Sequence, residues 1–174
     1  MNAADALAQV FVASRPDPAA AEDLAPFRPL IGSWDLLVTW HEEDGATRTA
    51  EGEWHFGWAL GGRAVADVWI TPSRAARADS DEDGEWGLSL RFHDPAIGAF
   101  RSTWLGPRNH VVLPFTARAA DGRIVLDAEH TPGVRTRWQF SEIGETSFHW
   151  ENMTSTDDGA TWTLRQEMHA TRPA

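Results

Sequence analysis

The stretch GEWHFGWALGGRAVADVWI, residues 52–70, decides the fold of this chain. Apolar and polar residues alternate on both sides of Gly61-Gly62, which is typical of two antiparallel strands joined by a two-residue hairpin loop. With that loop, Leu60 lies opposite Arg63, and each earlier residue of the first strand meets a later residue of the second. The sequence therefore predicts a hairpin whose register is fixed by its turn.

One face of this hairpin carries most of its rings, because directly opposed residues of an antiparallel pair point to the same side of the sheet. That face consists of Trp54, Phe56, Trp58, Leu60, Arg63, Val65, Asp67 and Trp69. We assign it to the protein interior because it is the bulkier and more aromatic face. The other face is small and not cleanly polar, so we expect the N-terminal helices, or a second copy of the chain in a homodimer, to cover it.

The same alternation continues from Leu30 to the end of the chain and is divided by turn signals such as Asp121-Gly122, a pair suited to a type I′ hairpin. The predicted strands cover residues 33–41, 51–60, 63–71, 86–93, 99–105, 110–118, 123–130, 134–141, 146–153 and 161–170. They follow one another without helical crossovers, and closure removes the two unpaired edges of such a sheet. We therefore expect an all-β fold, a single antiparallel meander β-barrel of about ten strands.

The N-terminal residues have a different pattern. Residues 3–13 predict a short helix, and residues 19–24 predict a second one before Pro26. We therefore divide the chain into a helical lead-in, residues 1–29, and a barrel domain, residues 30–174. Residues 73–85 are strongly polar and are interpreted as a mobile loop.

Composition limits the classes of partner. The chain has ten tryptophans and no tyrosine. It also has no cysteine, and this absence excludes disulfides and thiolate metal sites. Its net charge of −11 opposes binding to nucleic acid or to an anionic membrane, since both require a basic surface. The first ten residues lack the basic start of a signal peptide, and no apolar run approaches the roughly 18 residues of a membrane span, so we expect a cytoplasmic protein.

Residues Leu30-Ile31-Gly32-Ser33-Trp34 place a Gly-x-Trp motif at the start of the first strand. This entry resembles that of calycins, the superfamily of lipocalins, fatty-acid-binding proteins and avidins, and residues 52–70 resemble bacterial lipocalin-like domains of unknown function. The resemblance implies that Trp34 closes the base of the barrel and that a basic residue near the last strand packs over its ring. Arg172 is the preferred match for that residue, and Arg165 is the second choice.

Residues 155–162, Ser-Thr-Asp-Asp-Gly-Ala-Thr-Trp, match the Asp-box of sialidases and other β-folds. In those families the motif is a hairpin element remote from catalysis. Its serine and aspartate side chains can bond turn amides, and its tryptophan packs beneath the turn. We therefore interpret it as structural.

The ring-bearing face gives the first functional hypothesis, a small-molecule binding barrel for a hydrophobic or aromatic ligand. Its predicted ligand-binding residues are Trp54, Phe56, Trp58, Arg63 and Trp69. Asp67 would lie among these rings, either as a carboxyl whose pKa is raised by burial or as an ion-pair partner of Arg63.

Two alternatives remain. The first is a cofactor-independent cyclase, isomerase or hydratase acting on a natural-product-like substrate, with Asp67, His149 and Glu151 as catalytic residues; His149 and Glu151 lie two apart and share one strand face. The same pair could supply half of a metal site, but a third ligand is not visible, so we predict neither metal ligands nor a cofactor. The second alternative is a haem-binding barrel, as in nitrobindin-type calycins, with His149 or His169 as axial ligand.

Four arginines occupy mid-strand positions, Arg91, Arg101, Arg135 and Arg137. Facing inward, they would select a carboxylate or enolate group of a ligand. Arg91 alternates with Leu88, Leu90 and Phe92, whose apolar side chains suit a core. The alternation therefore favours outward-facing arginines.

Overall fold

The structure is a computed structural model that describes residues 2–77 and 84–174. Its elements are α1 (Ala3–Phe11), β1 (Val12–Ala13), η1 (Ala25–Leu30), β2 (Gly32–His41), β3 (Thr47–Ala59), η2 (Leu60–Gly62), β4 (Ala64–Thr71), α2 (Arg74–Arg77), β5 (Glu85–Asp94), β6 (Ala99–Gly106), β7 (Val111–Ala120), β8 (Arg123–Thr131), β9 (Val134–Ser141), β10 (Ser147–Ser155) and β11 (Thr163–Thr171). Within the described residues, no helix is both long enough and apolar enough to cross a membrane.

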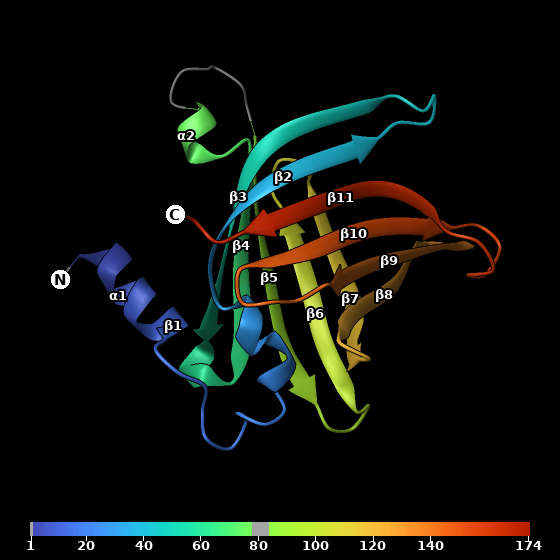
Figure 1. The fold of residues 1–174 in the computed structure, drawn as a ribbon. Coiled ribbons are helices and arrows are strands. Elements are labelled where there is room, and N and C mark those ends of the chain that lie inside the picture. The colour runs from blue at the N-terminus through green and yellow to red at the C-terminus, as the bar shows by residue number, and fades with distance from the viewer. Residues whose placement is uncertain (1, 78–83) are drawn as a thin grey trace.

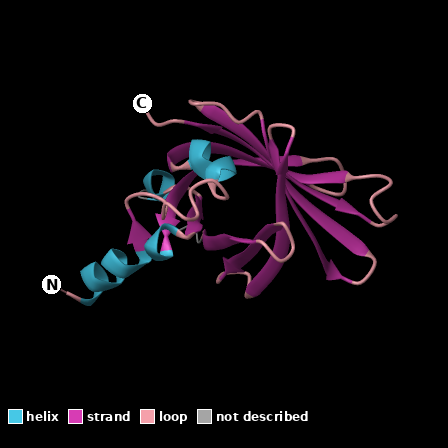
Figure 2. Ribbon diagram, turned by 90° about the horizontal axis from the view of Figure 1, so that it is seen from below, coloured by secondary structure: helices cyan, strands magenta, loops and turns pink. Residues whose placement is uncertain are grey.

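Strands β2–β11 form a closed antiparallel barrel, which confirms the predicted fold class (Figure 1). Each strand from β3 to β11 pairs with the next, and β11 returns to pair with β2, which itself pairs with β3. Viewed from below, the strands surround a common axis (Figure 2). Every one of these strands therefore has one face toward the barrel interior and one face outward.

The predicted hairpin register is confirmed. Trp58 pairs with Val65, Phe56 with Asp67 and Trp54 with Trp69, so the ring-bearing face of residues 52–70 does point into the barrel. The hairpin at Asp121-Gly122 also has the register that its turn predicts, with Ala119 opposite Ile124 and Ala117 opposite Leu126.

The N-terminal segment is only partly as predicted. The first helix ends at Phe11, and the next two residues form β1, which extends the sheet along the end of β3. No helix forms over residues 19–24, where the described chain makes turns; the 3₁₀ helix η1 follows instead. Over residues 19–24 the described chain has single turn hydrogen bonds, such as Leu24 N–H to the Ala20 carbonyl at 3.0 Å, that do not repeat as in a helix.

The lead-in covers the lower end of the barrel and part of its outer wall. Phe27 and Leu30 of η1 are fully buried in the main core. Phe11 packs on a second small cluster formed by Ala59, Ala64 and Ala66, which belong to the outer face of the β3–β4 hairpin. The helical lead-in therefore does cover part of this face, as expected.

Strand β5 is oriented opposite to the prediction. Its polar alternate residues face the interior: Ser89 is 3% exposed and Arg91 is 1% exposed, whereas Phe92 is 45% exposed. Register across the barrel decides this, since Arg91 is paired with the inward-facing Val65 and Ser89 with Asp67. The outward orientation predicted for Arg91 is wrong, because period-two alternation defines two faces without saying which one is inside.

The other three mid-strand arginines face outward as predicted, and each has an acidic partner. Arg101 bonds Asp94, Arg135 bonds Asp158 and Arg137 bonds Asp127. In the segment predicted as a mobile loop, Arg74–Arg77 form the short helix α2, and residues 78–83 lie outside the described residues.

Two motifs from the sequence adopt their expected structures. The Arg172 guanidinium lies 3.6 Å from the centre of the Trp34 ring, so Arg172 rather than Arg165 is the basic residue of the calycin-like entry. In the Asp-box turn, Ser155 Oγ accepts from the Gly159 amide at 2.8 Å. Asp157 accepts from the amide and the hydroxyl of Thr161, and these bonds, the hydroxyl first, lower the pKa of Asp157 to about 2.

Candidate functional site

The barrel contains a partly open cavity of about 170 Å³. Its walls combine tryptophans from six strands with a few polar side chains: Trp40, Trp54, Trp69, Glu85, Ser89, Arg91, Trp104, Asn109, Leu126, Trp138, Phe140, Trp150, Gln166 and Met168. Of the predicted ligand-binding residues, Trp54 and Trp69 line this cavity. Phe56 and Trp58 also point inward, but they belong to the packed core and are not among the lining residues.

Five of these rings form what we call the tryptophan belt: Trp69, Trp104, Trp138, Trp150 and Trp54. Successive ring centres along the belt are 6.0, 5.9, 5.4 and 6.0 Å apart, and each pair meets edge to face. The two ends of the belt lie directly opposite each other on β3 and β4. Edge-to-face contacts between large rings hold each ring in a defined orientation, so the belt gives the cavity rigid, flat walls.

Behind the belt lies a buried ion pair. Asp67 on β4 accepts from Arg91 Nη2 at 2.5 Å and from the Trp54 indole N–H at 2.6 Å. Both members of the pair are about 1% exposed. Burial raises the pKa of Asp67, while Arg91, Trp54 and Ser89 act in the opposite direction. The sequence suggested Arg63 as the ion-pair partner of Asp67, but the partner in the structure is Arg91.

Arg63 lies outside the cavity. Its side chain is 72% exposed and donates to Asp17 of the lead-in at 2.8 Å. The reason is that Arg63 directly follows η2 in the hairpin turn, beyond Ala59 and Ala64, the last paired residues of β3 and β4. Arg63 therefore does not line the barrel cavity.

Three buried donors at the cavity have no hydrogen-bond partner among the described residues: Arg91 Nη1, Trp138 Nε1 and Trp150 Nε1. An unsatisfied buried donor typically costs about 1–3 kcal/mol, so three around one cavity call for an explanation. The cavity is also lined by a buried acidic residue, Glu85. Its carboxylate accepts a hydrogen bond from Asn109 Nδ2 at 2.8 Å.

The remaining predicted catalytic residues do not join Asp67. His149 and Glu151 alternate with the buried Phe148 and Trp150 on β10, so both project from the outer face of the barrel. His149 contacts Glu167, and Glu151 accepts from Gln139 at 3.0 Å. The sequence correctly placed the two on one strand face, but that face is the outer one.

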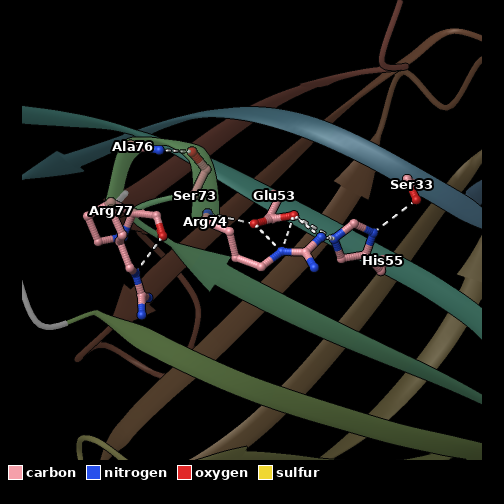
Figure 3. Close-up of polar contacts among 8 residues, drawn as sticks. Ser33, Glu53, His55, Ser73, Arg74, Ala76 and Arg77 are labelled. Atoms are coloured by element: carbon pink, nitrogen blue, oxygen red, sulfur yellow. Dashed lines mark hydrogen bonds and ion pairs between the residues drawn. The ribbon is translucent and has the colours of Figure 1, made fainter. Parts of the chain in front are cut away.

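The outer wall carries a second polar cluster beside α2, formed by Ser33, His55, Glu53 and Arg74 (Figure 3). His55 contacts Ser33 Oγ at 2.9 Å and Glu53 at 2.8 Å, the order of a serine–histidine–acid triad. Arg74, however, holds both carboxylate oxygens of Glu53, and its side-chain hydrogen bonds lower the pKa of Glu53 to about 2. This carboxylate is committed to a salt bridge that fixes α2 against β3.

Sequence reasoning missed most of the cavity wall. Trp104, Trp138 and Trp150 each alternate with more polar neighbours, which is the available signal, but the sequence does not bring their strands together. Glu85 and Ser89 were missed, and Arg91 was assigned outward, because polar residues on an inner face contradict the usual pattern of a buried strand.

No protein-family model and no curated protein sequence matches the chain. Solved structures that are similar in fold include two of comparable length. The S-type phycobiliprotein lyase CPES from Guillardia theta aligns with a TM-score of 0.55 at 12% identity, covering 89% of this chain and 93% of that one. Rv2717c from M. tuberculosis aligns with a TM-score of 0.57 at 13% identity, covering 91% of this chain and 99% of that one. These likenesses fit a calycin-like barrel and, at such identities, concern the fold alone.

Proposed function

We propose that this protein binds a small aromatic molecule bearing one oxygen acceptor inside the tryptophan belt. The observation that carries the proposal is the set of three unpartnered donors, Arg91 Nη1, Trp138 Nε1 and Trp150 Nε1, at one aromatic cavity. A bound carbonyl or hydroxyl oxygen has two lone pairs and would accept from at most two of these donors. The calycin-like fold supports the proposal by analogy only, because a fold hosts many functions.

Size limits the ligand. A cavity of about 150 Å³ lined by apolar side chains is known to hold benzene, and drug-sized ligands occupy roughly 300–1,000 Å³. The cavity of about 170 Å³ therefore suits one ring with one small substituent. A macrocycle of haem size would have to displace the belt, and His149, a predicted axial ligand, lies on the outer wall together with His169.

Charge favours a neutral acceptor over a carboxylate. The positive charge of Arg91 is already matched by Asp67, and Glu85 adds a carboxylate at the cavity. An anionic ligand would enter a low-dielectric space next to that carboxylate and pay a desolvation penalty as well. A ketone, aldehyde, amide or phenol avoids both costs.

The test compares acetophenone with α-methylstyrene, which replaces the carbonyl oxygen by a methylene group of similar shape. Binding is followed by quenching of tryptophan fluorescence and by thermal shift. We expect the ketone to bind about three- to tenfold more tightly, as one added hydrogen bond predicts. Trp138→Phe keeps a ring in the belt but removes one donor, so it should reduce this preference.

The matched control is Trp162→Phe, which alters a ring in the Asp-box turn, where Arg137 stacks on it. This variant should leave the preference for the ketone unchanged. Equal affinity of the two ligands for the unmodified protein, or no binding of either, would overturn the proposal.

The geometry does not favour the enzymatic alternative with the residues predicted for it. Asp67 is held by Arg91 and Trp54 and is not among the lining residues, while His149 and Glu151 face outward. A general base must reach its substrate within hydrogen-bond distance, directly or through one water. These three side chains cannot serve one bound substrate together.

A further inference from the structure

Three histidines gather around one carboxylate on the outer wall formed by β2, β11 and β10. His149 and His169 lie directly opposite each other, and Glu167 lies two residues before His169, hence on the same face. His41 reaches the cluster from β2. The two opposed imidazole rings are stacked with centres 4.5 Å apart and planes 14° apart.

The two oxygens of Glu167 have different neighbours. Oε1 contacts His41 Nε2 at 2.9 Å, whereas Oε2 contacts His149 Nε2 at 3.1 Å and lies 3.9 Å from His169 Nε2. The ligand atoms of His149, Glu167 and His169 all lie within 4.8 Å of one another. Because the two imidazole rings are stacked almost in parallel, both must rotate before their nitrogens and the carboxylate oxygen can surround a single ion.

The donor set has a defined chemistry. Two imidazole nitrogens and one carboxylate oxygen are the ligands of many zinc sites and of sites for neighbouring first-row metals, and such sites keep an open position for water. An imidazole can move its proton to Nδ1, which frees Nε2 to bind a metal. The chain's net charge of −11 also favours the approach of a cation.

A comparison within the same outer wall shows why this carboxylate is suited to a cation. Glu53 also contacts a histidine, His55, but Arg74 already neutralises both of its oxygens (Figure 3). Within the described residues, no arginine makes an ion pair with Glu167, whose recorded partners are all histidines.

We propose that His149, His169 and Glu167 bind a divalent transition-metal ion of the zinc class on the outside of the barrel. Glu167 uses Oε2 as the metal ligand, and His41 is a positioning residue that holds Oε1. The site is accessible to an ion from solvent, since the His169 side chain is 61% exposed while His149 is 16% exposed. It is separate from the interior cavity and does not depend on the proposed ligand.

The experiment uses the full chain without an affinity tag, treated with chelator and then titrated with Zn²⁺ by calorimetry and with Co²⁺ by absorption spectroscopy. We expect one ion per chain and a Co²⁺ spectrum that reports nitrogen and oxygen ligands. His149→Ala, His169→Ala and Glu167→Gln should each weaken binding at least about tenfold, the lower end of the loss seen even for outer-shell partners of metal ligands. Circular dichroism establishes that each variant is folded.

His55→Ala is the matched control, because it removes an outer-wall histidine that also contacts a carboxylate, and it should leave metal affinity unchanged. His41→Ala should weaken binding but retain the Co²⁺ spectrum, since the three ligands remain. The proposal is overturned if the unmodified chain binds neither ion, or if all three ligand variants bind as tightly as His55→Ala does.

Discussion

At the residue scale, the most important interaction inside this barrel is the buried ion pair between Asp67 and Arg91. Asp67 and Arg91 are almost fully buried, and each would be costly alone. The Trp54 indole also donates to the carboxylate, which links the ion pair to the cavity wall. The pair fixes the orientation of a belt ring as well as contributing its own charge interaction.

Removing one member of this pair should be strongly destabilising. Arg91→Met leaves the Asp67 carboxylate buried without its cation, and we expect a loss of about 3–5 kcal/mol in the free energy of unfolding, measured by urea denaturation. Replacing both residues, Asp67→Leu with Arg91→Met, should recover much of that loss, because no charge is then left unpaired.

The matched control for this series is Arg63→Met. It breaks the exposed contact with Asp17, and such surface pairs contribute about 1 kcal/mol or less. Similar losses for Arg63→Met and Arg91→Met would contradict the role assigned to the buried pair.

Among the elements, β5 departs furthest from the usual pattern, since its polar and small residues face the interior. Gly87 is one of them, and a Cβ at this position would lie 1.7 Å from Cη2 of Trp104. The absence of a side chain at Gly87 is what allows this belt ring to lie flat against β5. Gly87 therefore shapes the cavity wall, because its lack of a side chain leaves room for the Trp104 ring.

Gly87→Ala should displace Trp104 and cost about 1–3 kcal/mol, the usual range for overpacking. It should also weaken binding of acetophenone, because the displaced ring belongs to the cavity wall. Gly57→Ala is the control: it is also mid-strand, but nothing lies within 4 Å of its added Cβ, so stability and binding should hardly change. Urea denaturation and tryptophan quenching measure the two effects, and equal behaviour of the two variants would count against this account of Trp104.

The Asp-box turn between β10 and β11 makes its own pH-dependent contribution. The pKa of Asp157 is lowered from 3.8 to about 2, chiefly by the Thr161 hydroxyl, so the folded state binds the proton less tightly than the unfolded chain does. Its stabilising contribution is therefore fully present above about pH 4 and is lost as the pH falls through about 2.

Asp157→Asn should remove this part of the pH dependence, which is measured as the free energy of unfolding between about pH 5 and about pH 2. Thr161→Val keeps the carboxylate but removes its hydroxyl donor, so its profile should lie between those of the unmodified protein and Asp157→Asn. Identical profiles for all three proteins would show that the turn does not titrate in this way.

For the whole molecule, Arg172 joins the end of the last barrel strand to the start of the first one. It stacks on Trp34 of β2 and donates to the carbonyls of Pro29, Ile31 and Ser33, so it ties the end of the last strand to η1 and the first barrel strand. Trp34 in turn donates to the Leu30 carbonyl at 2.7 Å. The barrel base is closed by contacts between residues about 140 positions apart in sequence.

Arg172→Met should therefore lower the free energy of unfolding by about 1–3 kcal/mol, through lost stacking and unsatisfied carbonyls. Arg165→Met is the control within β11, where the polar contacts of the side chain with described residues are those with Thr154 and Glu43, and it should cost about 1 kcal/mol or less. Thermal and urea denaturation of both variants test this, and a larger loss for Arg165→Met would refute the assignment.

Local patterns were sufficient to predict the strands, the two hairpin registers and the Asp-box turn, because each of these depends on neighbouring residues. The contact of Arg172 with Trp34 was implied by the resemblance to calycins. The second N-terminal helix was predicted wrongly: residues 19–24 form turns, and the helical element that follows them is the 3₁₀ helix η1.

The candidate site was predicted only in part, namely Trp54, Trp69 and a buried Asp67. The sequence by itself determined that strands alternate, where they turn and which residues share a face. Only the tertiary structure decided which face of β5 lies inside, that Arg91 and not Arg63 pairs with Asp67, and that His149 meets Glu167 and His169. The physical reason is that alternation is a local property of one strand, whereas the partners of a buried charge or a histidine come from the strands that closure of the barrel places beside it.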